Sequence, residues 1–281
     1  YKGFEPGLIC RGKQYAENTV FEEEEAEICS CGMHFCENPF DVLDYYGFTN
    51  DNGDFNEFAE VEALDEVKTD DNRKFCTKKL KIGAKLSISK FINACVDFAI
   101  EKTSTCIADN KISSGDFAQI GSSGDSAQIG SSGYSAQIGS SGDFARIGSS
   151  GDFAQIGSSG DSAQIGSSGD SAQIGSSGDS ARIGSSGDSA RIGSSGDSAK
   201  IGSSGYSAQI GSSGKDCVIC CAGHNSAVKA KKGSWITLAE WEYSEEKERY
   251  IPKCVKTEFV DGERIKEDTL YKLIDGEFVE V

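Results

Sequence analysis

The sequence predicts a mainly β protein, in which a parallel β-solenoid lies between an α+β N-terminal domain and a small antiparallel β C-terminal domain. Three observations lead to this fold class. The middle of the 281-residue chain repeats a nine-residue unit, the residues before it mix strand-like and helix-like patterns, and those after it alternate apolar and polar side chains. Such short repeats must stack on one another to bury a core. The expected domain limits are 1–111, 112–228 and 229–281.

The repeat unit reads Ile-Gly-Ser-Ser-Gly-Asp-Ser-Ala-Gln, and its isoleucine recurs every nine residues from Ile120 to Ile219. Alanine and isoleucine lie two positions apart, so both face the core side of a short strand. The residue between them is Gln, Arg or Lys, which predicts a wet outer face. Gly-Ser-Ser-Gly is expected to form the turn, because glycine admits a positive φ. Two units per coil would give 18-residue turns, two parallel sheets and about six coils, whereas one unit per coil would double the length.

The repeat is similar to the parallel β-roll of RTX proteins, whose nonapeptide Gly-Gly-x-Gly-x-Asp-x-U-x binds Ca²⁺ in its turns. Here the second glycine is missing, and Tyr134, Tyr206 and Lys215 occupy the aspartate position. We therefore expect a column of solvated aspartates and no calcium.

Three phenylalanines interrupt the repeat. Phe117, Phe144 and Phe153 replace the serine before alanine, on the strand face opposite alanine and isoleucine, where they should be at least partly exposed. They either pack against the N-terminal domain or a second copy, or form an interaction surface for a partner.

The flanks predict their own elements. We expect strands over 1–4, 19–24, 55–64, 78–82 and 85–87, and a helix over 89–101 with apolar residues on one stripe. A further helix should run over 39–46, with Asn38 as its N-cap and Pro39 at the first helical position. C-terminal strands are expected over 235–243, 249–260, 270–273 and 278–281, with a hairpin turn at Asp275-Gly276. Both flanks are expected to cap the solenoid ends.

Composition excludes several classes of function. Lys and Arg number 28 against 45 Asp and Glu, a net charge of −17, so direct nucleic-acid binding is not expected. No apolar run approaches the ~20 residues of a membrane helix, so membrane insertion is not expected. The 11 cysteines are an odd number, which leaves at least one thiol unpaired within the chain. We expect a reducing compartment, the cytoplasm of a bacterial host.

Two Cys/His clusters have the ligand types of a zinc site. The first comprises Cys29, Cys31, His34 and Cys36, and the second comprises Cys217, Cys220, Cys221 and His224. Neither has the doubled spacing of a zinc finger, and Cys217 occupies an inward alanine position of the repeat. No metal is therefore expected, and P-loop, Gly-x-Ser-x-Gly and His-Glu-x-x-His motifs do not occur.

The stretch from Cys31 to Tyr46, with Tyr1-Lys2-Gly3-Phe4 before it, resembles ADP-ribosyltransferases. In that family a Gly-x-Tyr-Phe strand precedes a helix that ends in tyrosine, and the first core strand carries His or Arg before glycine. The resemblance implies NAD as cofactor. It implies the site residues His34, Tyr46, Glu60 and Glu62. The chain departs from the pattern at Lys2, where His or Arg is expected, and at His34, where tyrosine would stack on the nicotinamide.

Further motifs lie in both flanks. They are Lys2-Gly3-Phe4, Cys10-Arg11-Gly12, Gly32-Met33-His34-Phe35-Cys36-Glu37-Asn38-Pro39, Tyr45-Tyr46 and Gly233-Ser234-Trp235-Ile236-Thr237-Leu238-Ala239-Glu240. With these motifs the flanks resemble an uncharacterised family of phage and prophage proteins from gut Firmicutes, which implies no particular activity.

The function expected from the sequence is a non-enzymatic repeat scaffold or binding protein, without a cofactor. It would present a regular Ser/Asp/Gln surface to a protein partner, or associate with itself along the solenoid. Two alternatives remain open: a degenerate ADP-ribosyltransferase-like domain carried on a rod, and a protein that sequesters a small ligand or a host protein.

Overall fold

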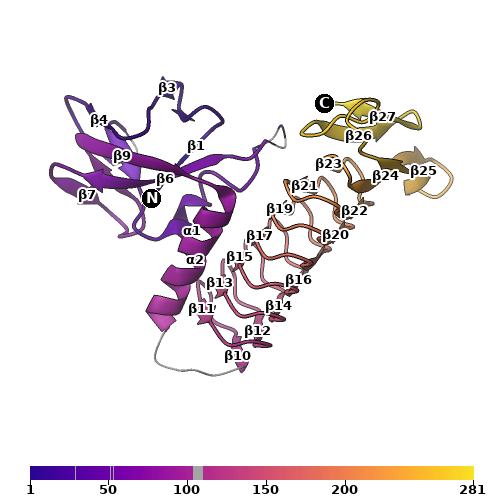
Figure 1. Ribbon diagram of the computed structural model, residues 1–281, viewed down its shortest axis with the longest axis horizontal. Coiled ribbons are helices and arrows are strands. Elements are labelled where there is room, and N and C mark those ends of the chain that lie inside the picture. The colour runs from indigo at the N-terminus through magenta and orange to yellow at the C-terminus, as the bar shows by residue number, and fades with distance from the viewer. Residues whose placement is uncertain (29, 51, 53, 104–109) are drawn as a thin grey trace.

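The computed structural model describes residues 1–28, 30–50, 52, 54–103 and 110–281. The expected fold class is confirmed: a parallel β-solenoid of about seven turns occupies residues 111–238, and small antiparallel sheets lie at the two ends of the chain. Figure 1 shows the solenoid as a ladder of strands with the N-terminal domain beside it.

Successive repeats alternate between two sheets. Strand partners lie 18 residues apart, as Gln128 pairs with Arg146 and Gln137 with Gln155, so two nonapeptides form one coil. One sheet, which we call the open sheet, consists of β10 (Asn110–Ser113), β12 (Gln128–Ser131), β14 (Arg146–Ser149), β16 (Gln164–Ser167), β18 (Arg182–Ser185), β20 (Lys200–Ser203), β22 (Val218–Cys221), β24 (Trp235–Ser244) and β25 (Arg249–Phe259). The other, the covered sheet, consists of β11 (Gln119–Ser122), β13 (Gln137–Ser140), β15 (Gln155–Ser158), β17 (Gln173–Ser176), β19 (Arg191–Ser194), β21 (Gln209–Ser212), β23 (Ala227–Lys229), β26 (Leu270–Ile274) and β27 (Glu277–Glu280).

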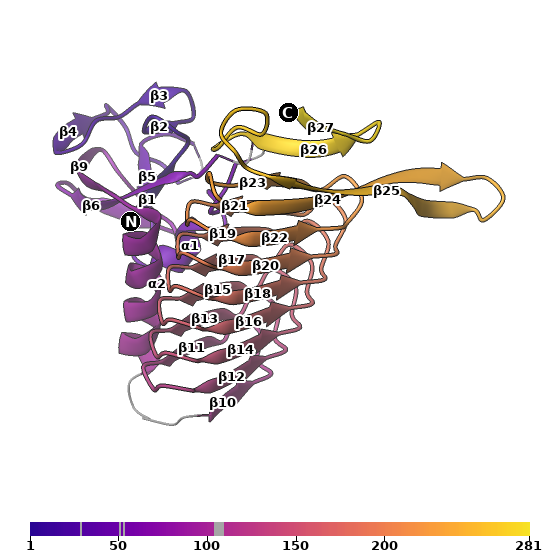
Figure 2. The same ribbon diagram turned by 45° about the vertical axis from the view of Figure 1, so that its right-hand side comes forward.

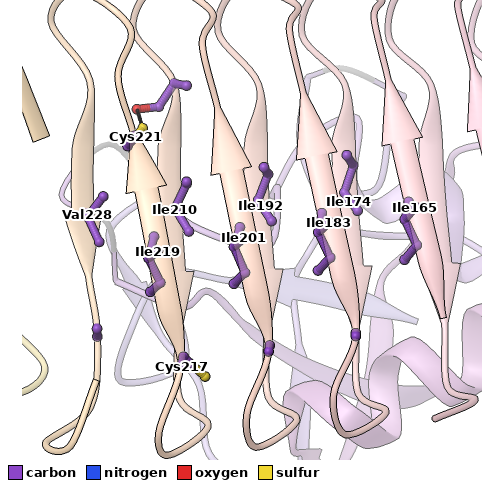
Figure 3. Packing of buried hydrophobic residues seen from close by; sticks show 14 of the residues in the cluster. Ile165, Ile174, Ile183, Ile192, Ile201, Ile210, Cys217, Ile219, Cys221 and Val228 are labelled. Atoms are coloured by element: carbon purple, nitrogen blue, oxygen red, sulfur yellow. Dashed lines mark hydrogen bonds between the residues drawn. The ribbon is translucent and has the colours of Figure 1, made fainter. Parts of the chain in front are cut away.

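The core of the solenoid is a narrow layer between the two sheets. Alanine, isoleucine and the first serine of each repeat point inward and are buried, and the isoleucines form two columns that meet in the middle (Figure 3). Full burial of an isoleucine side chain stabilises the fold by about 1.5–3 kcal/mol relative to leaving it exposed. Val228 and Ile236 continue the columns beyond the last regular repeat, and Cys217 takes an inward alanine position, as expected.

The corners of the coil differ from the expected turn. The strand includes Gly-Ser, and the turn is Ser-Gly-Asp-Ser, with the serine after aspartate in the left-handed region, as Ser126 is at φ 59°. The corner glycines do not have a positive φ, so that expectation was wrong. A Cβ on Gly133 would instead overlap the carbonyl oxygen of Gly115 in the preceding coil. Close stacking of coils therefore requires glycine at this position.

The first strand of the solenoid, β10, precedes a spacing that is one residue shorter than the nine-residue repeat. Ile112 precedes Ile120 by eight residues instead of nine, and β10 consequently pairs Lys111 with Ile129 and Ile112 with Gly130. Because side chains alternate between the faces of a strand, Ile112 points outward and is 90% exposed. Lys111 takes the inward position, and its Nζ donates a hydrogen bond to the carbonyl of Gly121.

The N-terminal domain is built on a four-stranded antiparallel sheet in the order β1-β6-β9-β4. The bounds of its elements are β1 (Lys2–Phe4), β2 (Ile9–Cys10), β3 (Lys13–Gln14), β4 (Thr19–Glu22), β5 (Met33–Phe35), α1 (Pro39–Val42), β6 (Glu57–Ala63), β7 (Val67–Thr69), β8 (Phe75–Thr77), β9 (Lys79–Leu86) and α2 (Ile88–Thr103). The expected strands and both helices are present, with Asn38 as the N-cap of α1, but α1 ends at Val42 and not at the expected position 46. The segments 78–82 and 85–87 form the single strand β9, and β2, β3, β7 and β8 were not predicted.

The two flanks meet the solenoid in different ways. The N-terminal domain lies against the face of the covered sheet, with α2 running along β11, β13, β15 and β17 (Figures 1 and 2), so the expected N-terminal end cap is wrong. The C-terminal strands do extend the stack: β24 pairs in parallel with β22, and β26 pairs antiparallel with β23. The β24–β25 hairpin projects beyond the solenoid (Figure 2).

Candidate functional site

The outer face of the covered sheet is a docking surface for the N-terminal domain. Gln137 and Gln155 are buried; their Nε2 atoms donate hydrogen bonds to carboxylate oxygens of Asp41, at 3.1 Å, and Asp44, at 2.7 Å. The expectation of a wet Gln face is therefore wrong for this sheet. Gln137 and Gln155 thus act as hydrogen-bond donors to carboxylates, and the next residue of the row, Gln173, donates to the carbonyl of Leu43 at 2.8 Å.

A column of glycines beside this row makes room for α2. An added Cβ on Gly121 would lie 2.5 Å from the backbone of Ala99, and one on Gly139 would lie 2.9 Å from the Cβ of the same alanine. Val96 contacts the same column at Gly139 and Gly157. The absence of side chains thus forms a groove that holds the apolar face of the helix.

The docking continues to the far end of the covered sheet. Arg191 donates a hydrogen bond from Nη1 to the carbonyl of Thr49 at 2.9 Å. Lys229 of β23, which lies opposite Gly211 of β21, forms an ion pair with Asp54 at 2.6 Å. Contacts of the N-terminal domain therefore extend from β11 to β23.

The open sheet has the same sequence pattern but no such cover among the described residues. Gly148, Gly166 and Gly184 are exposed, and an added Cβ at each would meet nothing within 4 Å. Two shallow grooves, of about 800 and 990 Å³, run along this glycine column. The open sheet thus presents an unfilled counterpart of the groove that holds α2.

The row beside these grooves is more basic than its counterpart. On the open sheet it consists of Gln128, Arg146, Gln164, Arg182 and Lys200, all exposed. Arg146, Arg182 and Lys200 form no ion pair within the part of the chain that the structure describes. On the covered sheet the corresponding positions from 119 to 209 carry one cation, Arg191.

The aspartate column is exposed, but its carboxylates bind the backbone. Oδ1 of Asp161 accepts a hydrogen bond from the N–H of Asp179 in the next coil at 2.8 Å. Tyr134 and Lys215 donate their own N–H groups to Asp116 and Asp197, which requires no carboxylate on the donating residue. This explains why the position tolerates tyrosine and lysine.

The described members of the two Cys/His clusters do not form a metal site. Within the described ranges no three His, Cys, Asp or Glu side chains gather where they could hold a metal ion. Cys217 and Cys221 are buried, Cys220 is exposed on the opposite face, and His224 stacks on Tyr250 with ring centroids 4.3 Å apart. Cys29 of the first cluster lies outside the described residues.

The three phenylalanines lie at corners instead of on a strand face, each at φ 56°, so their expected placement was wrong, although they are exposed as expected. Phe117 and Phe153 share one corner and flank Tyr134, with ring centroids 5.9 and 5.3 Å apart. The guanidinium of Arg73 lies 5.9 Å from the Phe117 ring. Phe144 stands on the other corner. The 18-residue coil period, which places positions 117, 135 and 153 in one column, is the signal that separates them.

The N-terminal domain contains a cavity of about 260 Å³ between β1, β5, the loop after β2 and the segment after α1. Gly3 allows this arrangement, since an added Cβ would lie 2.7 Å from the Cβ of Tyr46. The motifs Lys2-Gly3-Phe4 and Tyr45-Tyr46 are therefore two sides of one contact. The cavity is lined by Tyr1, Lys2, Gly3, Cys10, Arg11, Lys13, Tyr15, Glu23, Ser30, Cys31, Gly32, His34, Phe35, Cys36, Val42, Tyr45, Tyr46 and Lys74.

Lys2 is the most unusual lining residue. Lys2 is only 5% exposed, and its Nζ donates a hydrogen bond to the carbonyl of His34 at 2.8 Å. The ammonium also lies 5.6 and 5.4 Å from the ring centroids of Phe4 and Tyr15. Burial lowers the pKa of Lys2 below its ordinary value, because the charged form loses hydration.

The other polar groups of the cavity are also perturbed. Burial, together with the positive charges of Lys74, Lys2 and Arg11, lowers the pKa of His34 to about 4, so its imidazole is neutral near pH 7. The hydroxyl of Tyr46 donates to Sγ of Cys10 at 3.2 Å, and burial raises the pKa of Tyr46. The cavity therefore has neutral hydrogen-bonding groups alongside its cations.

Only two of the four transferase-like residues meet in this cavity. His34 and Tyr46 line it, whereas Glu60 lines a separate shallow groove beside α2. Glu62 pairs with Lys81 at 3.2 Å on the exposed face of the sheet. No sequence pattern assigned Arg11 or Tyr15 to a site, although Arg11 belongs to the motif Cys10-Arg11-Gly12.

None of the helices in the described ranges combines the length and apolar character that crossing a membrane requires. No curated protein and no solved structure gives a match to this chain. Residues 1–94, which contain the cavity and the start of α2, match a family described as Domain of unknown function (DUF7666).

Proposed function

We propose that this chain is a non-enzymatic scaffold whose open sheet binds a helix of a partner protein. One observation carries the proposal: near-identical repeats form two outer faces, of which one holds α2 in a glycine groove and the other is unfilled in the described part of the chain. The molecule thus contains an example of how its own repeat binds a helix.

That example defines the chemistry of the partner. On the covered sheet, Ile92, Val96 and Ala99 fill the glycine groove, and the carboxylates of Asp41 and Asp44 accept hydrogen bonds from the Gln row. A helix that binds the open sheet would present the same two features, apolar side chains for the groove and carboxylates for the row beside it.

Charge favours an acidic helix from another protein over a second copy of this chain. Arg146, Arg182 and Lys200 form a basic row on a chain of net charge −17. Carboxylates placed on this row would gain charge-assisted hydrogen bonds. A second copy would carry the same large negative charge and be repelled at long range. From β12 to β20 the row spans four strand steps, about 19 Å, which matches about 13 residues of helix.

The test uses a synthetic helical peptide as probe. It keeps the spacing of Ile92, Val96 and Ala99 and places glutamates on the flanking positions. Its binding to the full chain is followed by fluorescence anisotropy. Gly166→Val fills the groove and Arg182→Glu reverses the row, so each should weaken binding at least tenfold. Arg249→Glu, on the projecting hairpin, is the matched control and should leave binding unchanged.

Two results would overturn the proposal. The first is an absence of peptide binding, or binding that both variants leave unaltered. The second is a dimer in sedimentation velocity that Gly166→Val abolishes, because the open sheet would then be covered by a second copy.

We further propose that the protein works in the cytoplasm of a bacterial host and derives from a phage or prophage. The resemblance of both flanks to phage and prophage proteins, and the odd number of cysteines, support this setting.

A further inference from the structure

We propose that the cavity of the N-terminal domain binds a small phosphate ester, a sugar phosphate or a nucleoside monophosphate, with Lys2 and Arg11 as its anion ligands. This site is independent of the open sheet. A buried cation, the charge balance of the cavity and the size of the cavity support it.

The buried cation is Lys2. Lys2 is 5% exposed; its Nζ donates a hydrogen bond to the uncharged carbonyl of His34, and the side chain of Cys10 is a second hydrogen-bond partner. No carboxylate lies within ion-pair distance of its Nζ among the described residues. Burying an ammonium without a counter-charge is costly, and an anion bound in the adjoining cavity would offset that cost.

The charge balance of the cavity also favours an anion. Among the described residues its lining contains Lys2, Arg11, Lys13 and Lys74 and one carboxylate, Glu23. That carboxylate is already paired with Lys13 at 2.6 Å. Arg11 is exposed at the cavity and adds a planar guanidinium, whose fork of donors matches phosphate geometry. The cavity is thus net positive in a chain whose net charge is −17.

The size and walls of the cavity restrict the rest of the ligand. Its volume of about 260 Å³ lies below the range of about 300–1,000 Å³ typical of drug-sized ligands. The rings of Tyr15, Tyr45 and Tyr46 line it and offer apolar faces to a sugar or a base. A monophosphate with one or two small rings fits these limits, and a dinucleotide such as NAD exceeds them.

Titration calorimetry and ³¹P NMR on the full chain test the proposal with five probes: AMP, ribose 5-phosphate, inorganic phosphate, adenosine and NAD. We expect AMP or ribose 5-phosphate to bind with a dissociation constant below 1 mM, roughly −4 kcal/mol, and to shift the ³¹P resonance. Adenosine, which lacks the phosphate, and NAD, which is too large, should bind at least tenfold more weakly. Binding by inorganic phosphate alone would identify a free-anion site and overturn the assignment to an ester.

The variants locate the binding. Arg11→Gln removes an exposed guanidinium and should weaken ester binding at least tenfold without loss of fold. Lys2→Met removes the buried charge and should abolish binding, and its circular dichroism spectrum shows whether the domain is still folded. Lys81→Gln, on the exposed face of the sheet, is the matched control. The proposal is overturned if no phosphate probe binds, or if Arg11→Gln binds the ester as the control does.

Discussion

The carboxylate of Asp143 accepts a hydrogen bond at 2.8 Å from the backbone N–H of Asp161, which lies 18 residues later and one coil further along the solenoid. The carboxylate of Asp161 binds the N–H of Asp179 in the same way. Each corner thus carries a ladder of side-chain-to-backbone hydrogen bonds beside the backbone ladder of the sheets. The aspartate in the repeat is a structural residue that links successive coils.

Replacing Asp161 with alanine removes one step of this ladder. The N–H of Asp179 loses its acceptor, and we expect the free energy of unfolding to fall by about 1–2 kcal/mol, as for a hydrogen bond to a charged group. Urea unfolding followed by circular dichroism measures the change. Lys215→Ala at the same corner is the control, because Lys215 contributes no carboxylate. Equal stability losses in the two variants would contradict a structural role for the carboxylate.

The strands and the inward positions of the solenoid could be predicted from the sequence, whereas the conformation of its corners could not. The nine-residue period defines the inward positions, and the spacing of Ala118 and Ile120 within a repeat defines the strand. Which sheet would be covered could not be predicted, because consecutive repeats are nearly identical. That choice depends on tertiary contacts between α2 and glycines such as Gly121, and no local sequence pattern encodes these contacts.

The cavity was only partly predictable. Lys2, Arg11 and Tyr46 come together because β1 runs beside the segment after α1, and Gly3 allows the contact with Tyr46. The sequence marked these residues as motifs. It offered no signal for their convergence, since no short-range spacing relates position 2 to position 46.

Two Gly→Ala substitutions distinguish the two sheets. In Gly121→Ala the new Cβ would lie 2.5 Å from the backbone of Ala99 in α2, so the helix must shift, and we expect a loss of about 1–3 kcal/mol. In Gly166→Ala the Cβ meets nothing within 4 Å. There we expect a gain of about 0.5–1 kcal/mol, because alanine suits a strand better than glycine. Thermal unfolding of both variants measures the difference, and equal changes would show that α2 does not occupy the glycine groove.

His34 predicts a pH dependence of stability. Its folded pKa is about 4, below its ordinary value of 6.5. Between these two pH values the unfolded chain binds the proton and the folded chain does not. Stability from this group is therefore present above pH 6.5 and lost as the pH falls toward 4. After allowance for solvent screening we expect a loss of about 1–2 kcal/mol.

His34→Gln should remove this part of the acid sensitivity. The wild-type chain should lose more stability than His34→Gln between pH 7 and pH 4.5, while the carboxylates affect both chains alike. Because the chain has 2 histidines, imidazole resonances in an NMR titration can be assigned with this one variant. An apparent pKa near 6.5 for His34 would refute the buried, neutral imidazole.

The length of the solenoid is matched to the N-terminal domain, which contacts it from Gly121 near the first coil to Lys229 in β23. Deletion of residues 159–176 removes one 18-residue coil and keeps every later strand in its sheet. The ion pair between Lys229 and Asp54 is lost, because β23 moves by one strand step, about 4.8 Å. We expect a cooperatively folded chain whose melting temperature is lower by a few degrees.

Deletion of residues 159–167 removes half a coil and has a different consequence. Each later strand changes sheet, so Arg182 and Lys200 would face the N-terminal domain and the β24–β25 hairpin would extend the covered sheet. Over the distal half of the solenoid, the N-terminal domain would then face the side chains that normally lie on the open sheet. We expect this shorter deletion to destabilise the chain more than the longer one. Thermal unfolding and limited proteolysis of α2 compare the two, and a greater loss for the 18-residue deletion would show that the sheet in which a repeat lies does not matter for docking.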